Sequence, residues 1–344
     1  MDSRARLAIA GAGWSARNIA RGVEKAANLD IIAISNHDIV KARNLAREFS
    51  IPTTVDSHLD LCVMKDVEGI IISLPHRLHH PVALDALEHG KHVLVEKPIA
   101  TSTNDAREMI QEASRRNLVL GVYHQNRFND STLLAKQMID SGKLGKLLLA
   151  KIEVYLKRDG GYFTESKWRG RLNMEGGSAL INQAIHDIDL ALHLIGDVDL
   201  VAGFQSHLMH DIETEDNAVA AFKFTNGAFG TIQASISVKT PMGTSLTIHG
   251  TRGAIEIRKD SLIFFKGDGN IDRRDFAGER GISSKELKIL SHGRLLQDFS
   301  NAIKEGRAPA ITGTDGTRAL ELIESIYTSA RKSTVMGVNH ARAS

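Results

Sequence analysis

The first 124 residues alternate short, uniformly apolar stretches with amphipathic ones, and this alternation limits the possible folds more than any other feature. Strands that are apolar on both faces and separated by helices predict a parallel sheet covered on both sides. The predicted strands are 7–10, 31–35, 69–73, 92–96 and 119–123, and the predicted helices are 16–26, 39–49, 81–89 and 102–116. The sequence therefore predicts a doubly wound Rossmann domain that binds a dinucleotide, over residues 1–124.

The pattern changes after residue 124, where strand-like stretches follow one another without intervening helices. The predicted strands are 147–156, 200–209, 218–224, 230–238, 245–249, 254–259 and 262–265, and Asn226-Gly227 predicts a hairpin turn. Predicted helices at 133–140, 179–195, 295–304 and 316–331 would cover one face. Residues 125–344 are therefore expected to form an α+β substrate domain with a large, mostly antiparallel open sheet. A second subunit, in a dimer or tetramer, would cover its other face.

Composition excludes several classes of function. The 344 residues include 43 Lys and Arg against 41 Asp and Glu, so no basic excess points to nucleic acid or an anionic membrane. Cys62 is the sole cysteine, which rules out an internal disulfide, and its apolar neighbours predict an inert buried thiol. There is no apolar run of about 18 residues, and the apolar stretch 7–12 is too short for a signal-peptide core. We expect a cytoplasmic enzyme without a membrane partner.

A glycine-rich turn follows the first predicted strand. Gly11 permits the tight turn, Gly13 allows the backbone to approach a pyrophosphate, and the small Ala16 fills the third position of the motif. Trp14 and Ser15 lie between them, where the amide groups at the start of a helix attract an anion. The segment therefore predicts a dinucleotide site.

The end of the second strand bears on the choice between NAD and NADP. NAD-specific sites usually place an acid there to bind the ribose 2′-hydroxyl, whereas this chain has Ser35, Asn36 and His37. These side chains could donate hydrogen bonds to a 2′-phosphate, although Asp38 could reach the ribose if the turn shifted slightly. The pattern leaves both cofactors open and leans slightly to NADP.

Two further clusters carry candidate chemistry. Lys97 follows the fourth strand of the alternation, at the sheet edge where ligands bind, and Pro98 permits a cis peptide bond. Asn182 and His186 are four residues apart on a predicted helix, so they project from the same face. An amine near a cofactor cation and an imidazole are both suited to proton transfer.

Motifs along nearly the whole chain resemble the glucose–fructose oxidoreductase/inositol dehydrogenase (Gfo/Idh/MocA) family. They are Gly11-x-Gly13-Trp14, Leu74-Pro75-His76-x-x-His79, Glu96-Lys97-Pro98, Trp168-Arg169, the run from Gly176 through Asn182 and His186 to Asp189, and 298–309 with 319–330. The resemblance implies an NAD(P)-dependent oxidoreductase acting on sugars or cyclitols. It also implies that Lys97 and His186 handle the proton and that Glu96 lies by the nicotinamide. Asn126, Trp168 and Arg169 would frame the cofactor and substrate.

One departure from the family concerns Asn182, because many members have Asp at that position. An amide cannot accept a proton, so Asn182 is expected to orient the substrate while Lys97 and His186 transfer the proton.

The remaining candidates are given smaller roles. Leu74, Pro75, His76 and His79 are expected at the cofactor, with His79 also capping the following helix. A zinc site formed by His76, His79 and His80 is disfavoured because no Cys joins them. The residues expected to recognise the substrate are Tyr123, Arg158, Tyr162, Lys167, Arg171 and His210.

The expected function is hydride transfer between a nicotinamide cofactor and a hydroxyl-bearing carbon of a sugar or cyclitol. Two alternatives stay open from the sequence. One is a non-catalytic nucleotide- or sugar-binding sensor of the same fold, and the other is an NADPH-dependent reductase of keto-sugars.

Overall fold

A computed structural model describes residues 4–338, and the chain divides into two compact units. The first unit contains the residues up to Phe128 together with Lys288–Thr317, and the second contains Asn129–Leu287 and the residues from Arg318 onward. The sequence predicted one boundary, after residue 124, whereas the structure has the chain return to the first unit near its C-terminal end.

The first unit is built on a six-stranded parallel sheet, which confirms the predicted Rossmann architecture. Its strand order is β3-β2-β1-β4-β5-β6, so the order reverses at the neighbouring strands β1 and β4. Ligands of such sheets bind outside the carboxyl ends of the strands at this reversal. The strands are β1 (Ala5–Ala10), β2 (Leu29–Ser35), β3 (Thr53–Val55), β4 (Gly69–Ile72), β5 (His92–Glu96) and β6 (Leu120–Tyr123).

Helices connect these strands, and right-handed crossovers running in opposite directions from β1 place them on both faces of the sheet. They are α1 (Trp14–Val23), α2 (Ile39–Phe49), α3 (His58–Val63), α4 (His79–Glu88) and α5 (Thr103–Arg115), with short turns at His76–Leu78 and Gln125–Phe128. The short β3 and α3 were not predicted. Helix α11 (Ser284–Glu305) adds a further layer, because a side chain at Gly22 would collide with its His292 and Leu296.

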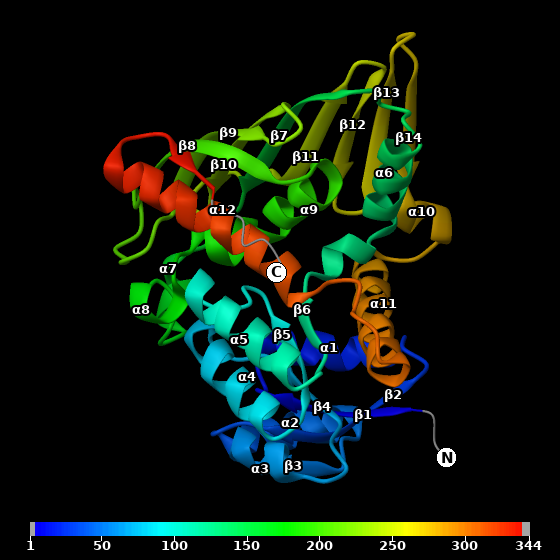
Figure 1. Ribbon diagram of the computed structural model, residues 1–344, viewed down its shortest axis with the longest axis vertical. Coiled ribbons are helices and arrows are strands. Elements are labelled where there is room, and N and C mark those ends of the chain that lie inside the picture. The colour runs from blue at the N-terminus through cyan, green and yellow to red at the C-terminus, as the bar shows by residue number, and fades with distance from the viewer. Residues whose placement is uncertain (1–3, 339–344) are drawn as a thin grey trace. The chain divides into compact units, whose positions relative to one another are not determined.

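The second unit contains a nine-stranded sheet in the order β14-β13-β12-β11-β7-β10-β9-β8-β15 (Figure 1). Among the described strands of this second sheet, only β10 and β7 pair in parallel, so the prediction of a mostly antiparallel sheet is confirmed. The strands are β7 (Leu147–Tyr155), β8 (Val198–Ser206), β9 (Asn217–Phe224), β10 (Phe229–Ser235), β11 (Gly243–Gly250), β12 (Gly253–Arg258), β13 (Ser261–Lys266), β14 (Ile271–Asp275) and β15 (Met336–Gly337). The predicted hairpin joins β9 to β10, with Gly227 at a φ of 89°.

Helices cover one face of this sheet. Helix α9 (Ile185–Ile195) contacts β7 and β11, α6 (Asp130–Asp140) contacts β12 and β13, and α12 (Gly313–Lys332) reaches β8, where the Oγ of Ser329 accepts a hydrogen bond from the Gly203 amide. Short helices lie at α7 (Gly160–Thr164), α8 (Leu172–Glu175) and α10 (Phe276–Arg280). The alternation along β9 marks the two faces, since its even-numbered residues are buried and Val219, Ala221 and Lys223 are exposed.

Two predicted helices differ from the structure. The helix predicted at 295–304 belongs to the longer α11, and its residues from Lys288 pack with the first unit rather than on the open sheet. The helix predicted at 179–195 consists of a π-helical segment, Ala179–Ala184, followed by α9. Periodicity alone could not distinguish these cases, because it predicts a helix but neither the spacing of its hydrogen bonds nor the unit against which it packs.

Candidate active site

The glycine-rich turn lies at the carboxyl end of β1, beside the end of β4. Gly11 has a φ of 114°, and a Cβ atom at this position would lie 2.0 Å from the carbonyl oxygen of Ser73. Packing within the protein therefore requires this glycine. By contrast, a Cβ atom at Gly13 would meet nothing within 4 Å. Packing within the protein therefore does not require a glycine at position 13. A glycine there is expected if a ligand has to approach the backbone closely.

The start of α1 is equally suited to an anion. Gly13 is its N-cap and provides no side-chain cap, and no acidic residue lies in the first turn. In the same unit, α2, α3 and α5 are capped by the side chains of Asp38, Ser57 and Ser102, whereas α4, like α1, has no side-chain cap. Uncapped amides at the positive end of a helix dipole favour a phosphate. The residues present therefore fit the pyrophosphate of a dinucleotide.

Asp38, the acidic residue beyond the end of β2, forms hydrogen bonds with the backbone. The Asp38 carboxylate accepts hydrogen bonds from the amides of Val40 and Lys41, and its own amide donates to the Asn36 side chain. Ser35 is buried and His37 is exposed. Asp38 thus caps α2 through Oδ1, while its Oδ2 lies 3.6 Å from Nζ of Lys41. Asn36 and His37 are the neutral polar side chains beside the expected ribose position.

The segment from Leu74 to His79 follows β4. His79 is fully buried, with Nδ1 at 2.7 Å from the Pro98 carbonyl oxygen and Nε2 at 2.9 Å from that of Leu74. The prediction that His79 caps the following helix is wrong, because α4 has no side-chain cap and this imidazole ties two loops together. Burial lowers the pKa of His79 to about 4, so near pH 7 the neutral ring donates a hydrogen bond to only one of the two carbonyl oxygens. His76 is buried beside it, with ring centroids 5.7 Å apart.

Glu96 and Lys97 lie at the end of β5. The Glu96 carboxylate accepts hydrogen bonds from the Ser15 hydroxyl on α1 and from the Lys97 amide, which ties the glycine-rich turn to this strand end. Burial raises the pKa of Glu96, and the positive charge of Lys97 acts against that shift. Lys97 is half-buried, and the Lys97–Pro98 peptide bond is cis, as the sequence allows.

Tyr123 does not fit its expected role in substrate recognition. It is fully buried at the end of β6, and its hydroxyl lies 2.9 Å from Nδ1 of His292 on α11. Burial raises the pKa of Tyr123 and lowers that of His292 to about 3. This pair fastens α11 to the sheet, whereas Asn126, in the turn after β6, is half-buried as a framing residue requires.

The sequence analysis missed Lys288 on α11. Its Nζ lies 4.9 Å from the centroid of the Trp14 ring, and its charge acts on the buried Glu96. Trp14 is 72% exposed, directly after the second glycine. No motif marks Lys288, because only the return of the chain to the first unit brings it to the glycine-rich turn.

In the second unit, the π-helical segment and α9 carry the polar candidates. Asn182 is buried within the π-helical segment, and His186 is half-buried on the first turn of α9. Glu215 anchors the start of this segment, because its carboxylate accepts hydrogen bonds from the amides of Ser178 and Leu180 and from the Tyr327 hydroxyl. π-Helical turns are frequent at functional sites.

Glu175, at the end of α8, is a second functional candidate that the sequence analysis missed. Its side chain is fully buried, and Oε1 lies 2.5 Å from Nδ2 of Asn182. Oε2 accepts hydrogen bonds from the Gly170 amide and the Ser178 hydroxyl, each at 2.6 Å. Burial raises the pKa of Glu175, while these hydrogen bonds act in the opposite direction. No spacing rule could reveal this cluster, because only the fold of the preceding loop brings its members together.

Tyr162 joins the same cluster from α7. Its hydroxyl accepts hydrogen bonds from Nε2 of Gln183 at 3.0 Å and from Nδ2 of Asn182 at 3.3 Å. The guanidinium groups of Arg169 and Arg158 lie 4.0 and 5.1 Å from the centre of its ring. Three predicted residues, Arg158, Tyr162 and Arg169, are thus gathered beside Asn182, and Trp168 lies 5.5 Å from the Arg169 guanidinium.

The other expected substrate contacts are less well supported. Lys167 and Arg171 are exposed. His210 uses both ring nitrogens internally, with Nδ1 at 3.0 Å from Asp216 and Nε2 at 2.8 Å from the Arg158 carbonyl oxygen. The expectation that His210 contacts substrate is therefore replaced by a structural role, in which it fixes the backbone at Arg158.

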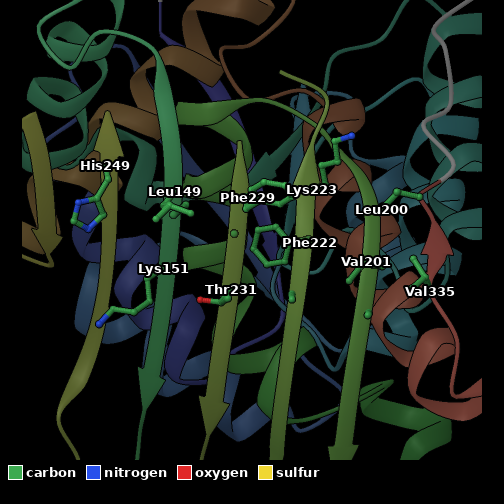
Figure 2. A pocket seen from close by; sticks show the side chains of 14 residues that line it. Leu149, Lys151, Leu200, Val201, Phe222, Lys223, Phe229, Thr231, His249 and Val335 are labelled. Carbon is green, nitrogen blue, oxygen red and sulfur yellow. The ribbon is translucent and has the colours of Figure 1, made fainter. Parts of the chain in front are cut away.

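The face of the nine-stranded sheet opposite the helices holds a groove of about 580 Å³ (Figure 2). Leu149, Phe229 and Leu200 line it together with Lys151 and His249. Phe229 is 56% exposed and lines the groove together with the exposed Leu149 and Leu200, so apolar surface is concentrated there. This groove lies away from the cluster around Asn182, because α9 and the π-helical segment pack against the other face.

The described residues 4–338 also bear on other classes of function. Among them, no group of three or more His, Cys, Asp or Glu side chains could hold a metal ion. None of the helices in this range is long and apolar enough to cross a membrane.

Two family descriptions match the chain. Residues 5–124 match an oxidoreductase family with an NAD-binding Rossmann fold, and residues 132–256 match the GFO/IDH/MocA C-terminal domain.

Two enzymes and one solved structure illustrate what this chain is similar to. The 1,5-anhydro-D-fructose reductase of Ensifer adhaerens is 27% identical over 92% of this chain and 93% of its own length. The scyllo-inositol 2-dehydrogenase (NAD(+)) of Bacillus subtilis is 25% identical over 94% of this chain and 93% of its own. A solved structure of levoglucosan dehydrogenase in complex with NADH and levoglucosan covers 98% of this chain and 100% of its own, with a TM-score of 0.90 at 23% identity. This last similarity bears on the fold alone.

Proposed function

Because this chain belongs to the Gfo/Idh/MocA oxidoreductase family, we propose that it transfers hydride between a nicotinamide cofactor and a hydroxyl-bearing carbon of a sugar or cyclitol. The observation that carries the proposal is the contrast between the two glycines of the first turn. Gly11 is required by internal packing, whereas Gly13 faces open space at the uncapped start of α1. Lys97 and Glu96 lie at the same edge of the sheet, which supports a nicotinamide site there.

The cofactor supplies the hydride acceptor, and the protein places the substrate and moves its proton. We assign the proton of the substrate hydroxyl to Lys97 and His186, which release it or return it according to the direction of the reaction. Asn182 has an amide side chain, so its role is to orient the substrate through hydrogen bonds.

NAD(H) is the cofactor that the family description supports. The Bacillus subtilis relative, whose name specifies NAD(+), points the same way. We propose that NADP(H) is also accepted, because the Asp38 carboxylate caps α2 through Oδ1 and has Nζ of Lys41 3.6 Å from Oδ2. Asn36 and the exposed His37 can donate hydrogen bonds to a 2′-phosphate. Dissociation constants for the two cofactors, measured by fluorescence titration, test this point.

The function is tested by incubating the protein with NAD or NADP and a panel of sugars and cyclitols, and by following the absorbance of the reduced cofactor. We expect Lys97→Ala to lower kcat by about 10²- to 10⁴-fold, which is the range for loss of a general acid or base. NADH binding should stay close to that of the parent protein.

Two results would overturn the proposal. Full activity in Lys97→Ala would remove that lysine from the chemistry. Tight cofactor binding without turnover of any sugar, cyclitol or keto-sugar would instead favour a sensor of the same fold.

We also propose that a second copy of this chain covers the open face of the nine-stranded sheet. The groove lined by Leu149, Leu200 and Phe229 supports this, since apolar surface of this kind is typical of subunit interfaces. Sedimentation equilibrium should give a mass at least twice the 37.6 kDa of one chain. Phe229→Asp should lower that mass to one chain, whereas Ile271→Asp, on the edge strand β14, should leave it unchanged. A single-chain mass for the parent protein would contradict the assignment.

A further inference from the structure

The amide of Asn182 has a defined orientation in the structure. A carboxylate only accepts hydrogen bonds, so the atom of Asn182 that lies 2.5 Å from Glu175 Oε1 is the nitrogen, Nδ2. The same nitrogen lies 3.3 Å from the Tyr162 hydroxyl. Because both amide hydrogens are directed at these two oxygens, the carbonyl oxygen Oδ1 points away from Glu175 and Tyr162.

Glu175 is itself held firmly as an acceptor. Its second oxygen, Oε2, receives the Gly170 amide and the Ser178 hydroxyl, and the Ser178 hydroxyl also lies 2.7 Å from that of Thr214. A backbone amide cannot reverse its role, so the position of Oε2 requires an acceptor. The carboxylate therefore cannot rotate freely, and its Oε1 stays in place as the acceptor for Nδ2 of Asn182.

This arrangement accounts for an amide at position 182, where many members of the family have Asp. A carboxylate at that position would place two like charges about 2.5 Å apart in a buried site. Two carboxylates at such a distance repel each other when both are ionised, and they share a proton as pH falls. The other titratable or charged groups that act on this cluster within the second unit include Arg158, Arg169, Tyr162 and Tyr327.

We propose that Glu175 is a positioning residue, which locks the Asn182 amide so that Oδ1 accepts a hydrogen bond from the reacting hydroxyl of the substrate. Glu175 thereby makes Asn, rather than Asp, the functional residue at position 182. This inference rests on the proposed function. It adds to that function a residue that acts through Asn182.

A double-mutant cycle tests the proposal with three variants, Asn182→Asp, Glu175→Gln and the two combined. Asn182→Asp should lower kcat at neutral pH by about tenfold or more, because the buried pair must then ionise or share a proton. Its activity relative to the parent should rise at acidic pH, where the shared proton restores a donor toward Glu175. Glu175→Gln should also lower kcat by about tenfold. The NH2 group of the glutamine would face a hydrogen-bond donor, either Nδ2 of Asn182 or the Gly170 amide, and would lose one of these hydrogen bonds. NADH affinity should be unchanged in both.

The combined variant is the decisive one. A glutamine introduced at position 175 can donate to an aspartate introduced at position 182, so the double variant should be more active than either single variant and should lose the acidic pH preference. Asn173→Asp, an exposed change of the same kind on α8, should behave like the parent protein. Losses that simply multiply in the double variant, or a pH profile for Asn182→Asp that matches the parent, would overturn the proposal.

A stability readout separates this inference from the proposed function. The melting temperature of Asn182→Asp should fall relative to the parent as pH rises, and the added Glu175→Gln change should restore it, even if no substrate is turned over. Should the parent protein be inactive while this pattern holds, the proposed function fails and the coupling between Glu175 and position 182 survives. Equal melting curves for the single and double variants would refute the coupling itself.

Discussion

Each unit holds a buried carboxylate beside its candidate site, and both receive hydrogen bonds and a positive charge. The strongest interaction that opposes the effect of burial on the pKa is a lysine charge at Glu96 and a hydrogen bond at Glu175. Glu96 in the first unit has lysine charges acting on it, from Lys97 next to it in sequence and from Lys288 on α11. Glu175 in the second unit accepts hydrogen bonds from the Gly170 amide, the Ser178 hydroxyl and the Asn182 amide. Burial raises the pKa of both, so each needs these partners to stay ionised.

The difference extends to the other buried titratable groups. In the first unit burial lowers the pKa of His79 to about 4 and that of His292 to about 3, so these rings are buried as neutral bases. In the second unit burial raises the pKa of Glu215 and that of Asp187, the latter to about 7. The two histidines therefore oppose protonation as pH falls. The two carboxyl groups of the second unit, like Glu96 in the first, oppose ionisation as pH rises.

The largest effect that would sharpen this comparison is expected at Asp187. Burial raises its pKa from 3.8 to about 7, so the folded chain keeps a proton that the unfolded chain releases within that window. The stability that depends on this carboxyl is fully present below pH 3.8 and is lost as pH rises to about 7. Asp187→Asn keeps a polar group toward Thr244 without this loss. We expect it to gain about 3 kcal/mol over the parent on going from about pH 5 to about pH 8.

Urea denaturation at the two pH values measures this gain. The matched control is Asp199→Asn, because Asp199 is exposed on β8. If the difference in unfolding free energy between Asp187→Asn and the parent is the same at both pH values, the protonation state of Asp187 does not change between them. The comparison of the two units then fails for this residue.

The sequence predicted the first unit well because its rules are local. Parallel strands buried on both faces are uniformly apolar, and a glycine-rich turn between the first strand and the first helix is typical of a dinucleotide-binding domain. The second sheet was predicted from alternation and turn residues, which gave its antiparallel character correctly but missed β14, whose five residues are all exposed. The return of residues 288–317 to the first unit was not predicted, because it depends on tertiary packing.

The candidate sites divide in the same way. Glu96 and Lys97 are neighbours in the sequence, so one motif supplies both the buried charge and a compensating one. Glu175 depends on Gly170, Ser178 and Asn182, whose backbone and side-chain groups meet only after the loop has folded. The roles predicted for His79 and His210 rested on residue type and position in the sequence. In the structure their ring nitrogens contact backbone carbonyl oxygens and, for Nδ1 of His210, the Asp216 carboxylate. Residue type therefore identified candidates, and only the contacts distinguished functional groups from structural ones.

The smallest expected effect tests whether a cation remote in sequence supports the first unit's site. Lys288 lies over the Trp14 ring and acts on Glu96, so its charge is close to the uncapped start of α1. Lys288→Met keeps most of the aliphatic chain and removes the charge. We expect NADH affinity to fall about two- to fivefold, which is the range for one partly exposed cation.

Fluorescence titration of NADH at low salt measures this loss, and high salt should reduce the difference between variant and parent because exposed charges are screened. Lys285→Met, one turn earlier on α11 and exposed, is the matched control and should bind NADH like the parent. If Lys288→Met also binds NADH like the parent, the charge of Lys288 is not needed for cofactor binding. Lys97 is then the only one of the two lysines near Glu96 that this site requires. Everything needed at the first unit's site would then lie within the motifs that the sequence displays, and the contrast with Glu175 would be complete.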